Sequence, residues 1–297
     1  MYQIIAKNKL AALHIMVIIL GFTGILGKLI TLKAAYLVWY RMLIAFVALF
    51  FFMFFKNNIK KIQKKNIMPL LGIGAIVALH WLFFFEAIKV SNISIAVICL
   101  ATSSLFSSFL EPIFFKRKVL AYEVIFGILV LCTLYFMLNE PSTEKENINY
   151  VYGYIYGIIS ALLATLFTLL NAKYISKIDA VEITMLEMLG GVLTISLLFI
   201  INNDYSIIHQ NINLYDITYL TLLATICTAG VFVWMIEIMR YITPYSLIMA
   251  VNLEPIYSVI IALIIFNESE TMNLSFYIGG GIILAIVFLD GYIKNKQ

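Results

Sequence analysis

Residues 34–55 read Ala-Ala-Tyr-Leu-Val-Trp-Tyr-Arg-Met-Leu-Ile-Ala-Phe-Val-Ala-Leu-Phe-Phe-Phe-Met-Phe-Phe, with Arg41 as the one charged side chain. As a helix, this run is long enough to cross about 30 Å of hydrocarbon. Similar apolar runs recur along the whole chain and leave no long polar segment for a second, soluble domain. The alternating pattern typical of outer-membrane strands is absent. The sequence therefore predicts an all-α membrane protein.

Composition excludes several classes of function. Of the 297 residues, 63% are hydrophobic and 12% are charged, whereas a soluble domain carries roughly 25% charged residues. The net charge of +4 comes from Lys and Arg in short loops, which argues against nucleic acid as a partner. Cys99, Cys132 and Cys227 each stand alone in an apolar run, so neither a disulfide framework nor a metal site is expected. No cofactor is expected.

The apolar runs predict ten transmembrane helices, and the basic residues predict their orientation. With the N-terminus inside, 15 of the 20 Lys and Arg fall in inner segments and three in outer loops. The positive-inside rule then places both termini in the cytoplasm, in a multi-pass protein of the cytoplasmic (inner) membrane. The predicted spans lie near 10–30, 34–55, 67–88, 92–114, 120–138, 151–172, 179–201, 214–238, 243–266 and 274–293.

A weak internal repeat divides the chain into residues 1–145 and 146–297. The segment Glu86-Ala87-Ile88-Lys89 resembles Glu237-Ile238-Met239-Arg240, which lies 151 positions later at the end of another span. Five spans in each half is an odd number, so the second half must enter the membrane from the opposite side. Two inverted five-helix repeats within one integral membrane domain, with a cavity between them, are typical of secondary transporters.

Motifs in the last quarter of the chain carry a resemblance to a known family. They are Arg240-Tyr241-Ile242-Thr243-Pro244, Asn252-Leu253-Glu254-Pro255, Phe266-Asn267-Glu268 and Gly279-Gly280-Gly281-Ile282-Ile283. The second half of the chain, which contains these motifs, resembles EamA-type transporters of the drug/metabolite transporter superfamily. The resemblance implies ten helices and the export of amino acids or other metabolites. It covers essentially the whole chain.

Glu254 is the strongest candidate for a functional side chain. At 1.5 Å per residue it lies about 16 Å into the ninth span, close to the bilayer centre. A carboxylate there is costly and is expected to face the bundle interior or water. Pro255 should kink the helix and free the carbonyl group of Val251. A substrate ammonium group or a coupling proton could bind there. The alternative is a carboxylate that only stabilises helix packing.

Other polar and aromatic side chains complete the expected site. Arg41 and Glu187 occupy similar positions in the second span of each half; they could bind substrate charge, close alternate gates or reach toward the headgroups. His80 could exchange a proton or be a packing residue, and Trp81 offers a cation–π wall. Ser103 occupies the repeat position of Glu254 and either lines the pocket or serves helix packing. The expected lining also includes Tyr40, Asn252 and Tyr257.

The sequence thus predicts a secondary transporter or exporter of a small, amino-acid-like metabolite or related amphiphile, working by alternating access. Its partners are a small-molecule solute and the lipid bilayer. Proton coupling and facilitated diffusion both fit, and the oligomeric state stays open. A translocator of lipid-linked substrates is an alternative. A membrane-embedded enzyme is a weaker one, because the loops are short and their carboxylates are scattered.

Overall fold

The computed structural model of the protein describes residues 9–55, 63–116, 120–139, 149–209, 212–266 and 272–294. Within these ranges the chain is helical apart from turns and short connections. Eight helical stretches are long and apolar enough to span a membrane, whereas Ala121–Met137 and Glu254–Phe266 are apolar but shorter. The prediction of a multi-pass α-helical membrane protein is confirmed, and the exact number of ten spans stays a prediction.

Seven helices run without interruption. They are α2 (Lys9–Leu29), α3 (Ala34–Phe55), α4 (Lys64–Val90), α7 (Ala121–Asn139), α8 (Tyr150–Asn171), α9 (Ala180–Ile201) and α14 (Leu274–Lys294). A short 3₁₀ helix, η1 (Ser206–His209), follows α9.

The other long helical stretches of the described residues are irregular. α5 (Ile93–Leu100) and α6 (Ser103–Phe115) form one interrupted helix, and α12 (Pro244–Val251) and α13 (Glu254–Phe266) form another. α10 (Leu214–Ala224) continues through a π-helical turn, η2 (Thr225–Gly230), into α11 (Val231–Ile238).

Short polar caps make the tight turns between these apolar helices possible. The first N–H groups of a helix have no partner within it, and Asn, Asp and Thr side chains accept hydrogen bonds from them. Such caps precede α5, α8, α9, α10 and α12 and are provided by Asn92, Asn149, Asp179, Asn213 and Thr243.

The two helix breaks have different causes. Between α12 and α13 the break comes directly before Pro255, as predicted, because proline cannot donate a backbone hydrogen bond to Val251. Between α5 and α6 it falls at Ala101 and Thr102, where there is no proline. There the hydroxyl of Thr102 donates to the Cys99 carbonyl oxygen (2.6 Å) and competes with the regular helical pattern.

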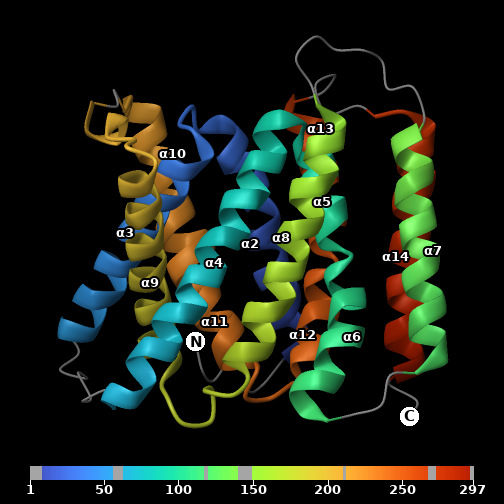
Figure 1. The fold of residues 1–297 in the computed structure, drawn as a ribbon, viewed down its shortest axis with the longest axis horizontal. Helices are drawn as coiled ribbons and strands as arrows, with labels where there is room; N and C mark the ends of the chain where they lie inside the picture. The colour runs from blue at the N-terminus through green and yellow to red at the C-terminus, as the bar shows by residue number, and fades with distance from the viewer. Residues whose placement is uncertain are drawn as a thin grey trace.

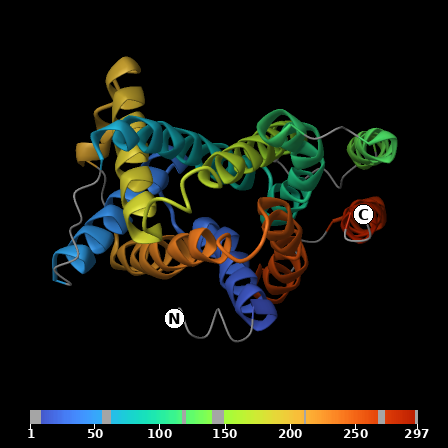
Figure 2. The ribbon, with the colours of Figure 1, turned by 90° about the horizontal axis from the view of Figure 1, so that it is seen from below.

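The packing of the helices follows the division of the sequence into halves. α4 packs against α8 and α9, while the corresponding span of the second half, α10–α11, packs against α2 and α3. In Figure 1, α5–α6 descends and α12–α13 ascends beside it, so the two interrupted helices run in opposite directions. α7 and α14 pack against each other at one edge of the bundle (Figures 1 and 2).

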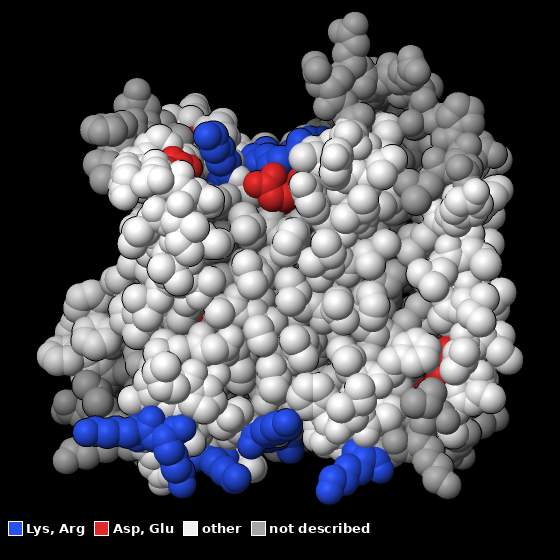
Figure 3. All heavy atoms as spheres, viewed as in Figure 1, with Lys and Arg blue, Asp and Glu red and all other residues white. Residues whose placement is uncertain are grey.

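Charged side chains mark the two ends of the bundle differently. On the face shown in Figure 3, Lys and Arg line the lower edge without acidic neighbours. At the upper edge, acidic and basic side chains occur together. The band between them is almost entirely uncharged, as a surface in contact with lipid tails requires.

Candidate functional site

A central cavity lies beside the two helix breaks. About 80 Å³ of it is open to the centres of water molecules, which is room for roughly five to eight waters. Its walls come from α2, α3, α4, α5, α6, α8, α11, α12 and α13. The polar side chains in the lining are Thr23, Arg41, His80, Ser103, Thr165, Thr168, Asn252 and Glu254. Trp81, Phe84, Phe167 and Phe232 supply the aromatic wall.

The two breaks meet through a hydrogen bond between the halves. Ser103, at the start of α6, donates from its hydroxyl to the Oδ1 of Asn252 at the end of α12 (3.3 Å). The Asn252 amide nitrogen has no hydrogen-bond partner among the described residues. Thr165 of α8 donates to the Ser103 carbonyl oxygen (2.9 Å) and fixes the position of this turn.

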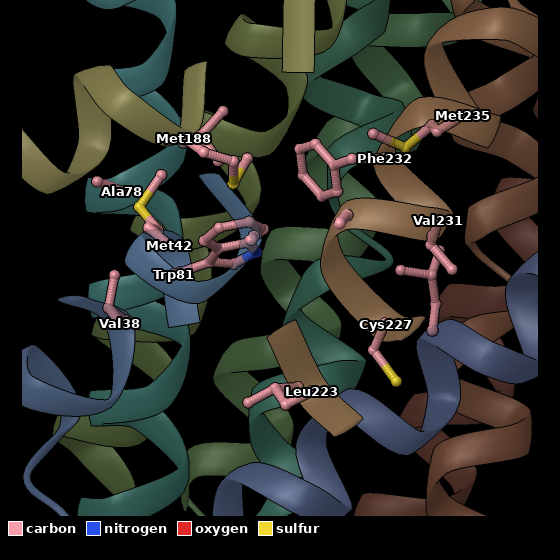
Figure 4. Packing of buried hydrophobic residues seen from close by; sticks show 14 of the residues in the cluster. Val38, Met42, Ala78, Trp81, Met188, Leu223, Cys227, Val231, Phe232 and Met235 are labelled. Carbon is pink, nitrogen blue, oxygen red and sulfur yellow. The ribbon is translucent and has the colours of Figure 1, made fainter. Parts of the chain in front are cut away.

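Arg41 is fully buried, and its guanidinium group stacks on an aromatic ring. The guanidinium carbon lies 3.8 Å from the centre of the Trp81 ring, a cation–π contact that is stronger where water is excluded. Its Nε donates to the hydroxyl of Thr228 (2.5 Å). The Nη1 atom has no partner among the described residues, so Arg41 keeps an unused donor at the cavity. In Figure 4, the side chains of Trp81 and Phe232 lie beside each other in the core, and their ring centres are 5.0 Å apart.

The π-helical turn η2 holds Arg41 in place. In this turn the hydroxyl of Thr228 donates to the Leu223 carbonyl oxygen five residues back (2.6 Å). The same oxygen atom of Thr228 accepts the hydrogen bond from Arg41. Single π-helical turns inside α-helices are frequent at functional sites, and here the turn ties the second half to the first.

Glu254 is the first residue of α13 and is 5% exposed. Arg41 and Glu254 attract each other electrostatically, but no ion pair joins them within the described residues. The cavity therefore holds a guanidinium group and a carboxyl group that form no direct ion pair with each other in the described part of the chain. A solute with both charges could bind between them.

His80 lies in the wall with one ring nitrogen engaged. Its Nδ1 is 2.9 Å from the Ser160 carbonyl oxygen and 2.8 Å from the Ser160 hydroxyl. The Ser160 hydroxyl also approaches the His80 carbonyl oxygen (3.0 Å). A proton on Nδ1 satisfies the Ser160 carbonyl and leaves Nε2 as an acceptor. The ring packs against Phe84 and Phe167.

The structure brings six of the nine predicted site residues together at the cavity: Arg41, His80, Trp81, Ser103, Asn252 and Glu254. The other three lie elsewhere. Tyr40 donates from its hydroxyl to the Ile207 carbonyl oxygen in η1 (3.4 Å). Tyr257 packs against Gly21 of α2, and its hydroxyl is 3.4 Å from the Nδ1 of His14. Glu187 is fully buried in α9, away from the cavity lining.

Sequence reasoning missed the contributions of α8 and η2. Thr165 and Thr168 line the cavity one helical turn apart on α8, and their spacing of three residues was a usable signal. Thr228 shows no comparable pattern, because its role depends on the π-helical turn around it.

The basic residue of each repeated segment binds a turn in its own half. Lys89 donates to the Ile30 carbonyl oxygen in the α2–α3 turn. Arg240 donates to the Ile178 carbonyl oxygen in the α8–α9 turn (2.8 Å) and pairs with Glu237 (2.9 Å). Each half thus ties its first turn to the end of its own third span. Asn267 and Glu268, which belong to the resemblance described above, lie outside the described residues.

These features define a class of protein: a multi-pass membrane protein with a charged, aromatic-walled cavity between two interrupted helices. The model of the EamA-like transporter family matches residues 9–139 and again residues 151–290. The chain belongs to this family and is consistent with the drug/metabolite transporter superfamily. Members are transporters of small solutes rather than enzymes.

Two further comparisons bear on the fold. No curated protein matches the chain. Among 28 matching chains of solved structures, one titled "Crystal structure of protein" has a TM-score of 0.64 and 12% identity. That match covers 96% of both chains, and at this identity it shows the fold alone.

Proposed function

We propose that the protein is a secondary transporter that moves a small zwitterionic metabolite across the cytoplasmic membrane by alternating access. The observation that carries this proposal is the position of Arg41 and Glu254 in one cavity between two interrupted helices. Interrupted helices at corresponding positions of two repeats are the usual place for a substrate site in secondary transporters.

The cavity chemistry favours an amino-acid-like solute with an apolar part. The free Nη1 of Arg41 and the free amide nitrogen of Asn252 are donors for a carboxylate. Glu254 offers a negative charge to an ammonium group. The rings of Trp81 and Phe232 provide an apolar surface for the rest of the solute. The volume suits a small metabolite rather than a large one.

The proposal includes ten spans in two inverted five-helix repeats, residues 1–145 and 146–297, with both termini in the cytoplasm. The opposite directions of α5–α6 and α12–α13 support the inversion. The basic lower edge in Figure 3 supports a cytoplasmic location for that end.

A translocator of lipid-linked substrates is the alternative, and one groove bears on it. This groove lies between α6, α7 and α8 and is lined by apolar side chains and by Thr102. The Thr102 hydroxyl already donates to the Cys99 carbonyl oxygen. The groove lining contains no charged group for a polar headgroup, whereas the central cavity contains two. The small zwitterion is therefore the better-supported substrate.

An uptake screen in reconstituted vesicles tests this function. Labelled amino acids and related zwitterions are offered to vesicles with wild-type protein, with Glu254→Gln and with Glu111→Gln. Glu111 is the matched control, because it also precedes a proline, Pro112, but does not line the cavity. We expect transport by the wild type and by Glu111→Gln, and loss in Glu254→Gln. Unchanged transport in Glu254→Gln would remove Glu254 from the mechanism.

A further inference from the structure

Glu187 differs from Asp216 and Glu237, two other buried carboxylates of the protein. It is fully buried in α9, and neither of its carboxyl oxygens has a hydrogen-bond partner among the described residues. By contrast, Asp216 accepts two hydrogen bonds from Thr31, and Glu237 pairs with Arg240. Burial of an unpaired charge is expensive, so such a group is expected to be neutral.

A polar side chain near the carboxyl group of Glu187 also lacks hydrogen-bond partners among the described residues. Asn171, at the end of α8, is close enough to interact with Glu187. It is fully buried, and both atoms of its amide lack hydrogen bonds in the described part of the chain. A protonated carboxyl group both donates and accepts, so it can satisfy an amide that likewise does both. An ionised carboxylate could only accept.

No charged side chain in the described ranges forms an ion pair with Glu187. α9 packs against α3, α4 and α11. Four charged or titratable side chains of these helices have hydrogen-bond partners other than Glu187. Arg41 binds Thr228, His80 binds Ser160, Lys89 binds Ile30, and Glu237 binds Arg240.

α4 and α9 approach each other closely at Glu187. A Cβ atom added to Gly74 of α4 would overlap the Glu187 backbone, and one added to Gly190 of α9 would overlap the Leu71 backbone. The two helices therefore touch through their backbones at the level of Glu187. Small residues allow such close approach in membranes. Glu187 is fully buried beside this contact.

We propose that Glu187, together with Asn171, is a proton-binding site that couples a proton to the conformational change of the transporter. The inference rests on the proposed transport function. With the α4–α9 contact closed, Glu187 holds a proton. When the contact opens, water hydrates the carboxylate and accepts the proton, and reclosing requires that Glu187 takes a proton from water again. The proton site is separate from the solute cavity, which contains Glu254 and His80.

Infrared spectroscopy of the purified protein tests the site without any solute. At neutral pH, the difference spectrum of wild type minus Glu187→Gln should contain the C=O band of a protonated carboxylic acid, shifted in deuterated water. The matched control is Glu182→Gln, in the first turn of the same helix, whose difference spectrum should lack this band. Absence of the band at Glu187 overturns the proposal.

Thermal unfolding gives a second readout that also checks folding. Because the closed conformation binds the proton, its melting temperature should fall as pH rises from neutral to alkaline. Glu187→Gln imitates the neutral side chain, so it should fold and lose much of this pH dependence. An unaltered pH dependence in Glu187→Gln contradicts the proposal.

Transport in vesicles then tests coupling. For a zwitterion that the uptake screen identifies, Glu187→Gln should still exchange solute across the membrane but should lose accumulation driven by a pH gradient. Accumulation equal to that of the wild type overturns the coupling role. The infrared result decides the proton site even where no solute of the screen is transported, so the two proposals fail independently.

Discussion

The two interrupted helices occupy corresponding places in the two halves, yet they are built differently. The α12–α13 break combines Glu254 with Pro255, and the α5–α6 break combines Thr102 with Ser103. Ser103 and Glu254 are 151 positions apart, the same spacing as Lys89 and Arg240. The repeat therefore preserves the place of the break, while the chemistry has diverged. The second half supplies the carboxyl group of Glu254, and the first half supplies a hydroxyl group and, from α3, the guanidinium group of Arg41.

A substitution that makes the two breaks alike should have the largest effect on substrate affinity. Glu254→Ser gives the second break the side chain found in the first and removes the partner of a substrate ammonium group. Loss of one member of a buried charge pair costs about 2–5 kcal/mol, which is roughly a 30-fold or greater loss of affinity. The measurement is the concentration dependence of uptake, with Ser103→Ala as the comparison. Equal losses in both variants would mean that the breaks are functionally equivalent.

Pro255→Ala tests whether proline causes the second break. Alanine restores a backbone N–H for the Val251 carbonyl group and favours a helix by about 3 kcal/mol over proline. We expect slower amide exchange around Asn252 and weaker transport. In the first break, Thr102→Val should slow exchange less, because its hydroxyl bond contributes about 0.5–1.5 kcal/mol. Unchanged exchange in Pro255→Ala would refute a proline-dependent break.

Thr228→Val probes the irregular backbone that is present in α10–α11 and not in α4. It leaves the buried Nε of Arg41 without its acceptor, at a cost of about 1–3 kcal/mol. The melting temperature in detergent should fall, and Thr228→Ser, which retains the hydroxyl, should restore most of it. If the valine variant melts like the wild type, η2 does not hold Arg41.

Loss of the hydrogen bond that joins the two breaks, from Ser103 to Asn252, should have the smallest effect on the free energy of unfolding. A double-mutant cycle of Ser103→Ala and Asn252→Ala should give a coupling energy of about 0.6 kcal/mol, the average for hydrogen bonds between membrane helices. Reversible unfolding in mixed detergent micelles provides the free energies. Strict additivity of the two substitutions would argue against contact between the halves at this point.

Apolar runs were sufficient to predict the membrane helices, because a span in lipid must be both long and apolar. Depth was also readable, since the rise per residue fixes how far Glu254 and Arg41 lie from the ends of their spans. The direction in which each side chain points around the helix axis could not be predicted. Helices that are apolar all round carry little information on which side faces a cavity, which is why Tyr40 and Tyr257 were expected at the site but lie outside it.

The first break was not predictable for a different reason. No proline marks Ala101 and Thr102, and threonine hydroxyls bond back to the backbone in many unbroken helices. The effect of Thr102 depends on how α6 packs against α8, where Thr165 binds the Ser103 carbonyl group. Glu187 was predicted as a site residue from its charge within a span, but tertiary packing places it away from the cavity lining.

The stacking of Arg41 on Trp81 gives the protein a built-in optical reporter. The chain has three tryptophans, and Trp81 alone lines the cavity, while Trp39 donates to Ser196 and Trp234 lies outside the lining. With Trp39 and Trp234 replaced by phenylalanine, the fluorescence of Trp81 would change whenever a solute displaces the guanidinium group from its indole. Occupancy could then be titrated in unlabelled protein, one compound at a time.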